Sequence, residues 1–371
     1  MNFKVNKKEL LDSLNIASRA ISSTTPLPSL TGIKFETLEN ELILKSSDSN
    51  ISIKIPINNN NGKKLEVLEE GEIVIEAKYI LEIVRKIDAN EVGIEIIDGT
   101  LIKIYGGNSE FKINCMKASD YPEINFNSNG KPFTLKSNIF KDIIDETAFA
   151  CSTNETRPVL TGVNFKASGK KLEVNATDSY RLARKIIDID EENEFNITVP
   201  AKYLNDVYHS IEDDKDISIV IDNQKIMFMV DDILIQTRLL DDQFPDTSKL
   251  IPTAFNQTLT INSKDLIKAI DRASFIKSDG KNIVKLSISK DKVNITANNQ
   301  TSSSFENIGV ILFTGDNFEI SCSGKYLQDA LSSFDSNEVT ISFSGDLKPM
   351  ILTSKDDESL IQLISPVRTM R

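Results

Sequence analysis

The sequence predicts an α+β protein made of three tandem copies of one unit of about 125 residues. The first observation is a short motif that occurs three times, as Ala77-Lys78-Tyr79, Ala201-Lys202-Tyr203 and Gly324-Lys325-Tyr326, with its lysines 124 and 123 residues apart. The second is that Leu30-Thr31-Gly32 returns as Leu160-Thr161-Gly162, 130 residues later. Motifs that recur in one order at nearly one spacing indicate internal repeats.

Two further pairs of motifs support the repeat and set its limits. Ser47-Asp48-Ser49 returns as Thr177-Asp178-Ser179, and Tyr121-Pro122 returns as Phe244-Pro245. Stretches containing Pro and Asn interrupt the periodic pattern near residues 126 and 251. We therefore expect three domains, covering residues 1–125, 126–250 and 251–371.

Each unit is expected to open with a strand that leads into a helix. Short alternating strands occur at residues 3–5, 133–135 and 259–261. A residue suited to cap a helix follows each of them, and apolar residues then recur at helical spacing. The caps are Asn6, Ser137 and Asn262 or Ser263, and the apolar residues are Leu10, Leu11, Leu14 and Ile21, then Phe140, Ile143, Ile144 and Thr147, then Leu266, Ile267 and Ile270.

The rest of each unit is expected to consist of strands and one shorter helix. Alternating apolar and polar residues at 41–44 and 52–55 predict strands in the first unit. The Ala-Lys-Tyr motif predicts the second helix, with Ile80, Leu81 and Val84 on one face. Alternation at 94–96, 217–221 and 339–343 closes the three units. The expected content is two helices and about eight strands per unit, packed as helices on antiparallel sheets.

Composition excludes several classes of protein. The 371 residues include 40% hydrophobic and 26% charged residues with only 15 Gly and 11 Pro, which is typical of a globular chain. No apolar run is long enough for a membrane span, and the first residues do not resemble a signal peptide. Cys115, Cys151 and Cys322 lie far apart, and His209 is the one histidine, so disulfides, metal sites and histidine-based catalysis are not expected. We expect a cytoplasmic protein.

The distribution of charge is uneven. The chain carries a net charge of −12, which by itself argues against bulk attraction to nucleic acid. The six predicted helical segments nevertheless carry a net charge of +4. Solvated helix faces account for such lysines equally well, but a single cationic helical surface would suit weak, non-specific contact with phosphates.

No motif for catalysis rises above chance. The sequence has no glycine-rich nucleotide motif, and Ser274 with Lys277 matches the spacing of serine acyl-enzymes without their partner motifs. Adjacent aspartates such as Asp213-Asp214 fall where turns are expected. We therefore predict no catalytic residue, no metal and no cofactor. A hydrolase using Ser274 and Lys277 or a carboxylate pair, and a protein scaffold that never binds DNA, are the two alternatives.

One stretch, Ala176-Thr177-Asp178-Ser179-Tyr180-Arg181-Leu182-Ala183, is more elaborate than a turn requires. An Asp can close such a turn through its side chain, and Arg181 is positioned to pair with Asp178. With this stretch, residues 157–162, Phe244-Pro245-Asp246 and the ending at 363–368, the whole chain resembles the bacterial sliding clamps, the beta subunits of DNA polymerase III.

The resemblance implies a fold and a role. Three DNA-clamp domains per chain would assemble as a head-to-tail homodimer, giving a six-domain ring with twelve helices around the hole and sheets outside. Such a ring encircles double-stranded DNA without reading its sequence and tethers the replicative DNA polymerase, which raises the local concentration of the enzyme. The implied partners are DNA, a second copy of the chain, a clamp-loader ATPase, the polymerase and other proteins carrying a clamp-binding motif, with no membrane and no catalysis.

The resemblance also implies binding residues. A hydrophobic peptide pocket between the second and third repeats would consist of Leu160, Thr177, Ser179, Tyr180, Arg181, Leu182, Pro245, Leu250, Tyr326, Pro349, Leu363, Ile364, Pro366, Val367 and Arg368. As bare sequence, these are residues at strand and loop ends that suit an ordinary core equally well. Ser179 replaces a glycine of better-known members, Tyr180 a histidine, and Ser365 alters the closing motif.

Two more sets of residues follow from the resemblance. The cations expected to face DNA are Lys8, Lys78, Arg85, Lys141, Arg157, Lys202, Lys268, Arg272 and Lys325. The subunit interface is expected to join the edge strand holding Phe111 and Ile113 to Phe275 and Ile276 of the third repeat. Pairing of edge strands across subunits would leave no exposed edge, although both pairs would also suit an internal core.

Overall fold

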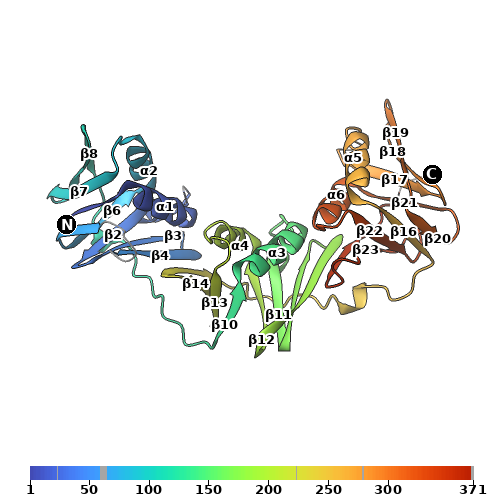
Figure 1. The fold of residues 1–371 in the computed structure, drawn as a ribbon, viewed down its shortest axis with the longest axis horizontal. Helices are drawn as coiled ribbons and strands as arrows, with labels where there is room; N and C mark the ends of the chain where they lie inside the picture. The colour runs from blue at the N-terminus through green and yellow to red at the C-terminus, as the bar shows by residue number, and fades with distance from the viewer. Residues whose placement is uncertain (23, 59–64, 223, 278–279, 369–371) are drawn as a thin grey trace. The chain divides into compact units, whose positions relative to one another are not determined.

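The computed structural model describes residues 1–22, 24–58, 65–222, 224–277 and 280–368, which form two compact units. The first unit consists of residues 1–138 and 202–239, and the second of residues 139–201 and 240–371. The middle repeat is thus divided between the units, because its sheets are continuous with those of the first and third repeats. Figure 1 shows the order of the elements along the chain.

Six α-helices occur among the described residues, two in each repeat as predicted. Their bounds are α1 Lys7–Ala17, α2 Ala77–Lys86, α3 Ser137–Thr147, α4 Ala201–Tyr208, α5 Ser263–Ala273 and α6 Gly324–Ser332. The predicted caps Asn6 and Asn262 accept hydrogen bonds from the backbone N–H groups of Glu9 and Asp265, at 3.2 and 3.0 Å. Ser137 instead begins α3, and its hydroxyl accepts a hydrogen bond from the N–H of Lys215. Ile21 is not helical, because α1 gives way to a 3-10 turn and Ile21 has an extended backbone.

The first unit contains two antiparallel sheets, of five and eight strands, in the orders β5-β1-β7-β8-β9 and β10-β13-β14-β15-β4-β3-β2-β6. The strands are β1 Asn2–Asn6, β2 Gly32–Leu38, β3 Glu41–Ser47, β4 Ile51–Asn58, β5 Leu65–Glu69, β6 Gly71–Glu76, β7 Glu91–Asp98, β8 Leu101–Gly106, β9 Ser109–Asn114, β10 Pro132–Lys136, β13 Asp216–Ile221, β14 Lys225–Val230 and β15 Ile233–Arg238. Leu10, Leu14, Ile80 and Val84 of α1 and α2 are fully buried. The predicted apolar helix faces therefore form part of the core.

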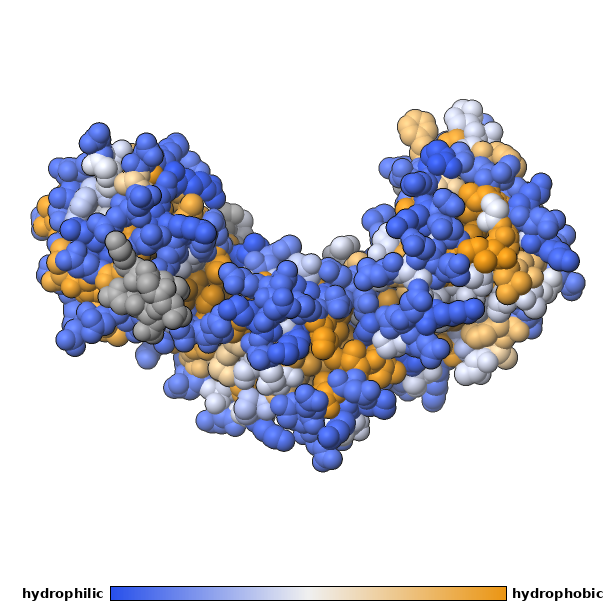
Figure 2. Space-filling view, viewed as in Figure 1, coloured by the Kyte–Doolittle hydropathy of each residue, from blue (hydrophilic) through white to orange (hydrophobic). Residues whose placement is uncertain are grey.

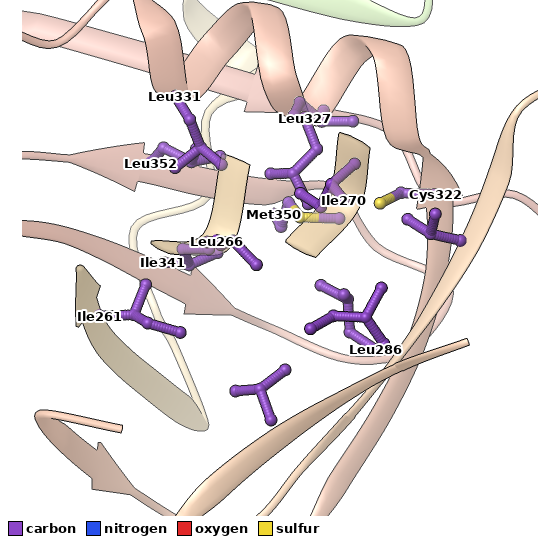
Figure 3. Packing of buried hydrophobic residues seen from close by; sticks show 14 of the residues in the cluster. Ile261, Leu266, Ile270, Leu286, Cys322, Leu327, Leu331, Ile341, Met350 and Leu352 are labelled. Carbon is purple, nitrogen blue, oxygen red and sulfur yellow. The ribbon is translucent and has the colours of Figure 1, made fainter. Parts of the chain in front are cut away.

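The second unit contains sheets of seven and four strands, in the orders β11-β12-β24-β23-β22-β16-β20 and β19-β18-β17-β21. The strands are β11 Gly162–Thr177, β12 Arg181–Pro200, β16 Gln257–Asn262, β17 Ile283–Ile288, β18 Lys292–Asn298, β19 Ser303–Gly309, β20 Leu312–Thr314, β21 Phe318–Ser323, β22 Glu338–Phe343, β23 Met350–Thr353 and β24 Leu360–Ile364. Figure 3 shows the core of the third repeat, where Leu266 and Ile270 of α5 and Leu327 of α6 pack with Leu286 and Ile341 of the strands.

The number of strands differs between repeats. The first and third repeats each have nine described strands and the middle repeat has six, against about eight expected in each. The middle repeat has fewer because β11 and β12 run through positions at which the first repeat breaks its strands. Gly169, with a left-handed φ of 61°, lies at an irregularity where β11 continues, whereas β2 and β3 are separate strands.

Candidate functional site

The second and third repeats share one sheet through a junction between β12 and β24, which we call the second junction. These strands pair antiparallel, with Leu182 directly opposite Leu363. Leu182 is 1% exposed and forms a small cluster with Leu363 and Ile351, against which Ile251 and Ile361 pack. This cluster is separate from the large core of the third repeat, so it provides an apolar base at the junction.

Two exposed apolar residues lie close in sequence to residues of this base, and a second small apolar cluster holds the predicted Leu160. Tyr180 precedes β12 and is 65% exposed, and Leu250 is 51% exposed. Leu160 is buried in a second small cluster with Val159 and Phe244, next to the predicted Pro245 in the chain. Figure 2 shows hydrophobic side chains at the surface over β11 and β12, with hydrophilic ones around them. An exposed aromatic and an exposed leucine beside an apolar base are suited to binding a hydrophobic segment.

A tight turn connects β11 to β12 and presents Tyr180. Asp178 Oδ1 accepts hydrogen bonds from the N–H groups of Tyr180 and Arg181 at 2.9 and 3.0 Å. The Thr177 hydroxyl accepts one from the N–H of Ser179 and donates one to the carbonyl of Arg181. Ser179 has a left-handed φ of 79°. The turn is therefore held by its own side chains, and it accounts for Thr177, Asp178 and Ser179.

Arg181 connects this turn to α6. Its Nε lies 3.0 Å from Asp178 Oδ2, and a terminal nitrogen lies 2.7 Å from Asp329 Oδ2. The guanidinium also lies over the ring of Tyr326, 4.4 Å from the ring centre, and near that of Phe149. Partial burial raises the pKa of Tyr326. The predicted pair with Asp178 is confirmed, whereas Asp329 and Phe149 are partners that sequence reasoning missed.

The segment at residues 365–368 is held beside the same turn. The N–H of Ser365 donates to the carbonyl of Tyr180 at 2.8 Å, and the N–H of Val367 donates to the carbonyl of Ser321 at 2.7 Å. Pro366 and Val367 are half-buried and Arg368 is exposed. Pro349 immediately precedes β23, the strand that follows β24 in the sheet. These contacts hold the closing segment beside the turn.

One predicted pocket residue lies elsewhere. Ile364 is fully buried in the core of the third repeat, because neighbouring residues of a strand face opposite sides of the sheet and Leu363 faces the junction. Sequence reasoning also missed Ile251, Ile351 and Ile361. Alternation along residues 361–364 identifies the two faces, but it does not indicate which face meets β12.

The predicted cations are distributed over all six helices, with one exception. Lys8, Lys78, Arg85, Lys202, Lys268, Arg272 and Lys325 are exposed, and Lys141 of α3 is half-buried. Several are paired: Arg272 with Glu306 at 2.6 Å, Lys325 with Asp329 at 2.8 Å and Arg85 with Glu82 at 3.4 Å. Arg157 is exposed but precedes a 3-10 turn, so it does not belong to a helical surface.

The residues predicted for the subunit interface differ in exposure. β9 is the outer strand of its five-stranded sheet, with Phe111 and Ile113 half-buried on it. Phe275 is 90% exposed, whereas Ile276 is buried in the core of the third repeat. Phe275 and the edge of β9 are therefore available to a partner, and Ile276 contributes to its own core.

Ser274, the nucleophile of the alternative catalytic hypothesis, has a structural contact. The Ser274 hydroxyl donates to the carbonyl of Asp271 at 2.9 Å and lies at the end of α5, as a helix-terminal serine often does. No group of three or more metal-ligating side chains occurs among the described residues. Within the same part of the chain, no helix combines the length and the apolar composition needed to cross a membrane.

Comparison with known proteins gives consistent matches along the chain. Three family models match in order: the N-terminal domain of the DNA polymerase III beta subunit at residues 1–125, its central domain at 134–246 and its C-terminal domain at 248–368. The beta sliding clamp of Staphylococcus epidermidis is 37% identical over 375 residues, with all of both chains covered. Among solved structures, the sliding clamp of Bacillus subtilis matches with a TM-score of 0.95 at 34% identity over all of both chains. The DNA polymerase III beta chain of Streptococcus pneumoniae also matches with a TM-score of 0.95 at 34% identity, over 99% of this chain and all of that one.

Proposed function

Because the chain belongs to the family of DNA polymerase III beta subunits, the beta sliding clamps, we propose that it is a processivity factor that encircles duplex DNA and tethers a polymerase. The observation that carries this proposal is the ordered match of all three family domains along one chain of three repeats. In this role the protein neither makes nor breaks a covalent bond. A protein retained by topology needs only weak, non-specific contact with phosphates, which suits exposed cations on the helices of an otherwise acidic chain.

We infer that two copies form the ring, each contributing domains 1–125, 126–250 and 251–371. Support comes from the two outer strands, β9 in the first unit and β19 in the second, which both present an unpaired edge. The exposed Phe275, close in sequence to the end of α5, would be covered in such an assembly. Opening the ring to admit DNA requires an energy source, and a partner ATPase is proposed because the sequence has no nucleotide-binding motif.

The ring is tested by mass and by topology. Light scattering is expected to give about twice the 41.4 kDa chain mass. After loading with a clamp-loader ATPase, the protein is expected to remain on nicked circular DNA and to leave the same DNA when it is made linear. A strict monomer at micromolar concentration, or equal retention on both DNA forms, would contradict the proposal.

We propose further that the second junction is the docking site for the partners' hydrophobic peptide. Its apolar base of Leu182, Ile351 and Leu363 and its exposed neighbours Tyr180 and Leu250 support this assignment. A double substitution, Tyr180→Ala with Leu250→Ala, is expected to weaken binding of the polymerase by at least about tenfold while the dimer persists. Leu68→Ala, at an exposed leucine of β5 in the first unit, is the control, and unchanged binding by the double variant would refute the site.

A further inference from the structure

The junction between the first and second repeats has the same backbone design as the second junction. Here β4 pairs with β15, and we call this pairing the first junction. The N–H of Arg238 donates to the carbonyl of Asn50 at 3.1 Å, as Ser365 does to Tyr180 at the second junction. Asp48 Oδ1 accepts two backbone hydrogen bonds at 2.9 Å, as Asp178 does. Ser49, at the place of Ser179, has a φ of 80°.

The side chains at the first junction are polar where those at the second are apolar. The cross-strand pair of Leu182 and Leu363 is replaced by Ser52 and Gln236. The exposed Tyr180 is replaced by Asn50, 130 residues earlier. The amide of Gln236 donates to the carbonyl of Asn125, so the segment that ends the first repeat lies against this surface. Ser52 and Gln236 are already hydrogen-bonded within the chain, Ser52 to Ser47 and Gln236 to Asn125 and Lys225. The first junction therefore lacks the apolar base of the second junction and suits a different ligand.

A cavity of about 330 Å³ lies at the first junction. Leu27, Leu30 and Pro122 contribute an apolar part of its lining, and Ser49, Gln236 and Arg238 a polar part. Leu27 is among the exposed large hydrophobic residues of the chain. A second cavity, of about 560 Å³, shares part of this lining and adds Lys45 and Lys54. The volume of the first cavity lies within the range of small-ligand and side-chain pockets.

The charges that line the two cavities are mostly positive, in a chain whose net charge is −12. Lys45 is paired with Glu36 at 2.7 Å and lowers the pKa of that carboxyl. Lys225 donates to the carbonyl groups of Asn125 and Asn127. Among the described residues, Arg238 and Lys54 have no ion pair and no side-chain hydrogen bond to a partner. Glu123 is the one carboxylate in either lining, so a surplus of positive charge remains.

We propose that the first junction is a second peptide site, which binds an extended segment of a protein partner carrying an acidic residue beside an apolar one. The carboxylate pairs with the Arg238 guanidinium, which can donate two parallel hydrogen bonds to it. The neighbouring apolar side chain lies against Leu27 and Pro122. A peptide fits better than nucleic acid because part of the lining is an apolar wall, which a phosphate backbone does not use.

The test uses the full-length protein and two fluorescein-labelled peptides, Gly-Ser-Leu-Asp-Leu-Gly and the same peptide with Asn in place of Asp. Fluorescence anisotropy is expected to show about tenfold tighter binding of the Asp peptide, the equivalent of one charge-assisted hydrogen bond. Arg238→Gln is expected to abolish this preference, and because Arg238 is exposed the variant should fold, which its thermal unfolding checks. Arg157→Gln, at an exposed arginine outside both junctions, is the control and should retain the preference.

Two further measurements distinguish binding at the first junction from binding elsewhere on the chain. Tyr180→Ala with Leu250→Ala should leave binding of the Asp peptide unchanged, and loss of binding there would place the peptide at the second junction instead. Equal affinity of wild type and Arg238→Gln for the Asp peptide would overturn the proposal. The proposal would also be overturned if Arg238→Gln lost binding to a duplex oligonucleotide while its affinity for the Asp peptide stayed unchanged. None of these outcomes depends on whether the chain forms a ring, so failure here is distinct from failure of the clamp proposal.

Discussion

Arg181 is the residue that links most parts of the second junction. It contacts the turn through Asp178, helix α6 through Asp329 and Tyr326, and the 3-10 turn after α3 through Phe149. Its side chain is only 12% exposed, so Asp178 and Asp329, and not water, stabilise its positive charge. Arg181 therefore holds the turn that carries Tyr180 and joins the second and third repeats within one compact unit.

Replacing Arg181 with methionine should be costly. Asp178 and Asp329 would lose their shared cation in a partly buried place, and the free energy of unfolding is expected to fall by about 2–3 kcal/mol. Urea denaturation followed by circular dichroism measures this change. Lys171→Met is the control, since its ion pair with Asp188 is largely exposed and should contribute less than about 1 kcal/mol. Equal effects of the two substitutions would mean that the Arg181 network does not hold the junction.

Glu146 gives the second junction a dependence on pH. Burial raises the pKa of the Glu146 carboxyl from 4.5 to about 7 and outweighs the effect of Lys185, which lies 2.8 Å away and lowers it. Lys185 also pairs with Asp357, whose negative charge raises the pKa of Glu146 further. The folded chain then holds a proton on Glu146 at pH values where the unfolded chain has released it, so this group destabilises the fold above pH 7 and less so as the pH falls toward 4.5.

Substitution of Glu146 isolates this effect. The unfolding free energy of wild type minus that of Glu146→Gln is expected to increase as the pH is lowered from about 8 to about 5, because only the wild type gains the proton. Urea denaturation at several pH values across that range gives the difference. A constant difference would show that the carboxyl group is ionised in the folded protein throughout.

At the scale of elements, the turn between β3 and β4 in the first repeat recurs between β11 and β12 in the middle repeat. Ser49 and Ser179 have φ values of 80° and 79°, and each lies two residues after a hydroxyl residue that accepts its N–H. A left-handed φ is unfavourable for any residue with a Cβ and free for glycine. This conformation explains why a glycine stands at the position of Ser179 in better-known clamps.

Restoring that glycine should stabilise the turn. Ser179→Gly is expected to raise the unfolding free energy by about 0.5–1 kcal/mol, since the relief of backbone strain exceeds the added freedom of the unfolded chain. Ser303→Gly, at an exposed position in β19 where φ is not left-handed, should instead destabilise slightly. Thermal unfolding of both variants compares them, and a stabilisation of similar size in each would remove the argument from φ.

At the scale of the whole molecule, the negative net charge does not show where the positive side chains lie, and contact with DNA depends on their positions. The chain is acidic, yet Lys78, Lys202 and Lys325 occupy the same position in the second helix of each repeat, and all three are exposed. Lys325 is paired with Asp329 at 2.8 Å, and Lys202 lies 3.9 Å from Asp48. Three equivalent, exposed lysines suit weak contact with phosphates at any position along the DNA, which allows the protein to slide.

Reversing these three charges tests that arrangement. The variant Lys78→Glu, Lys202→Glu, Lys325→Glu is expected to fold and dimerise normally, since exposed ion pairs contribute little to stability. Once loaded on nicked circular DNA, it should be lost faster, and its retention should depend less on salt because fewer phosphate contacts are made. Retention equal to wild type at every salt concentration would favour a scaffold that does not touch DNA.

The sequence by itself determined the threefold repeat, the α+β class, the six helices with two of their caps, and the resemblance to sliding clamps. These follow from local periodicity and motif order, which each stretch of chain carries alone. The tertiary structure decided which faces meet. Only the pairing of β12 with β24 places Leu182 against Leu363 and turns Ile364 into the core, and only packing of α6 brings Asp329 to Arg181 across 148 residues. It also buried Ile276 while leaving Phe275 exposed. Such contacts depend on the register between strands that are distant in the sequence. Alternation along one strand predicts its two faces, but it does not predict which residues each face packs against.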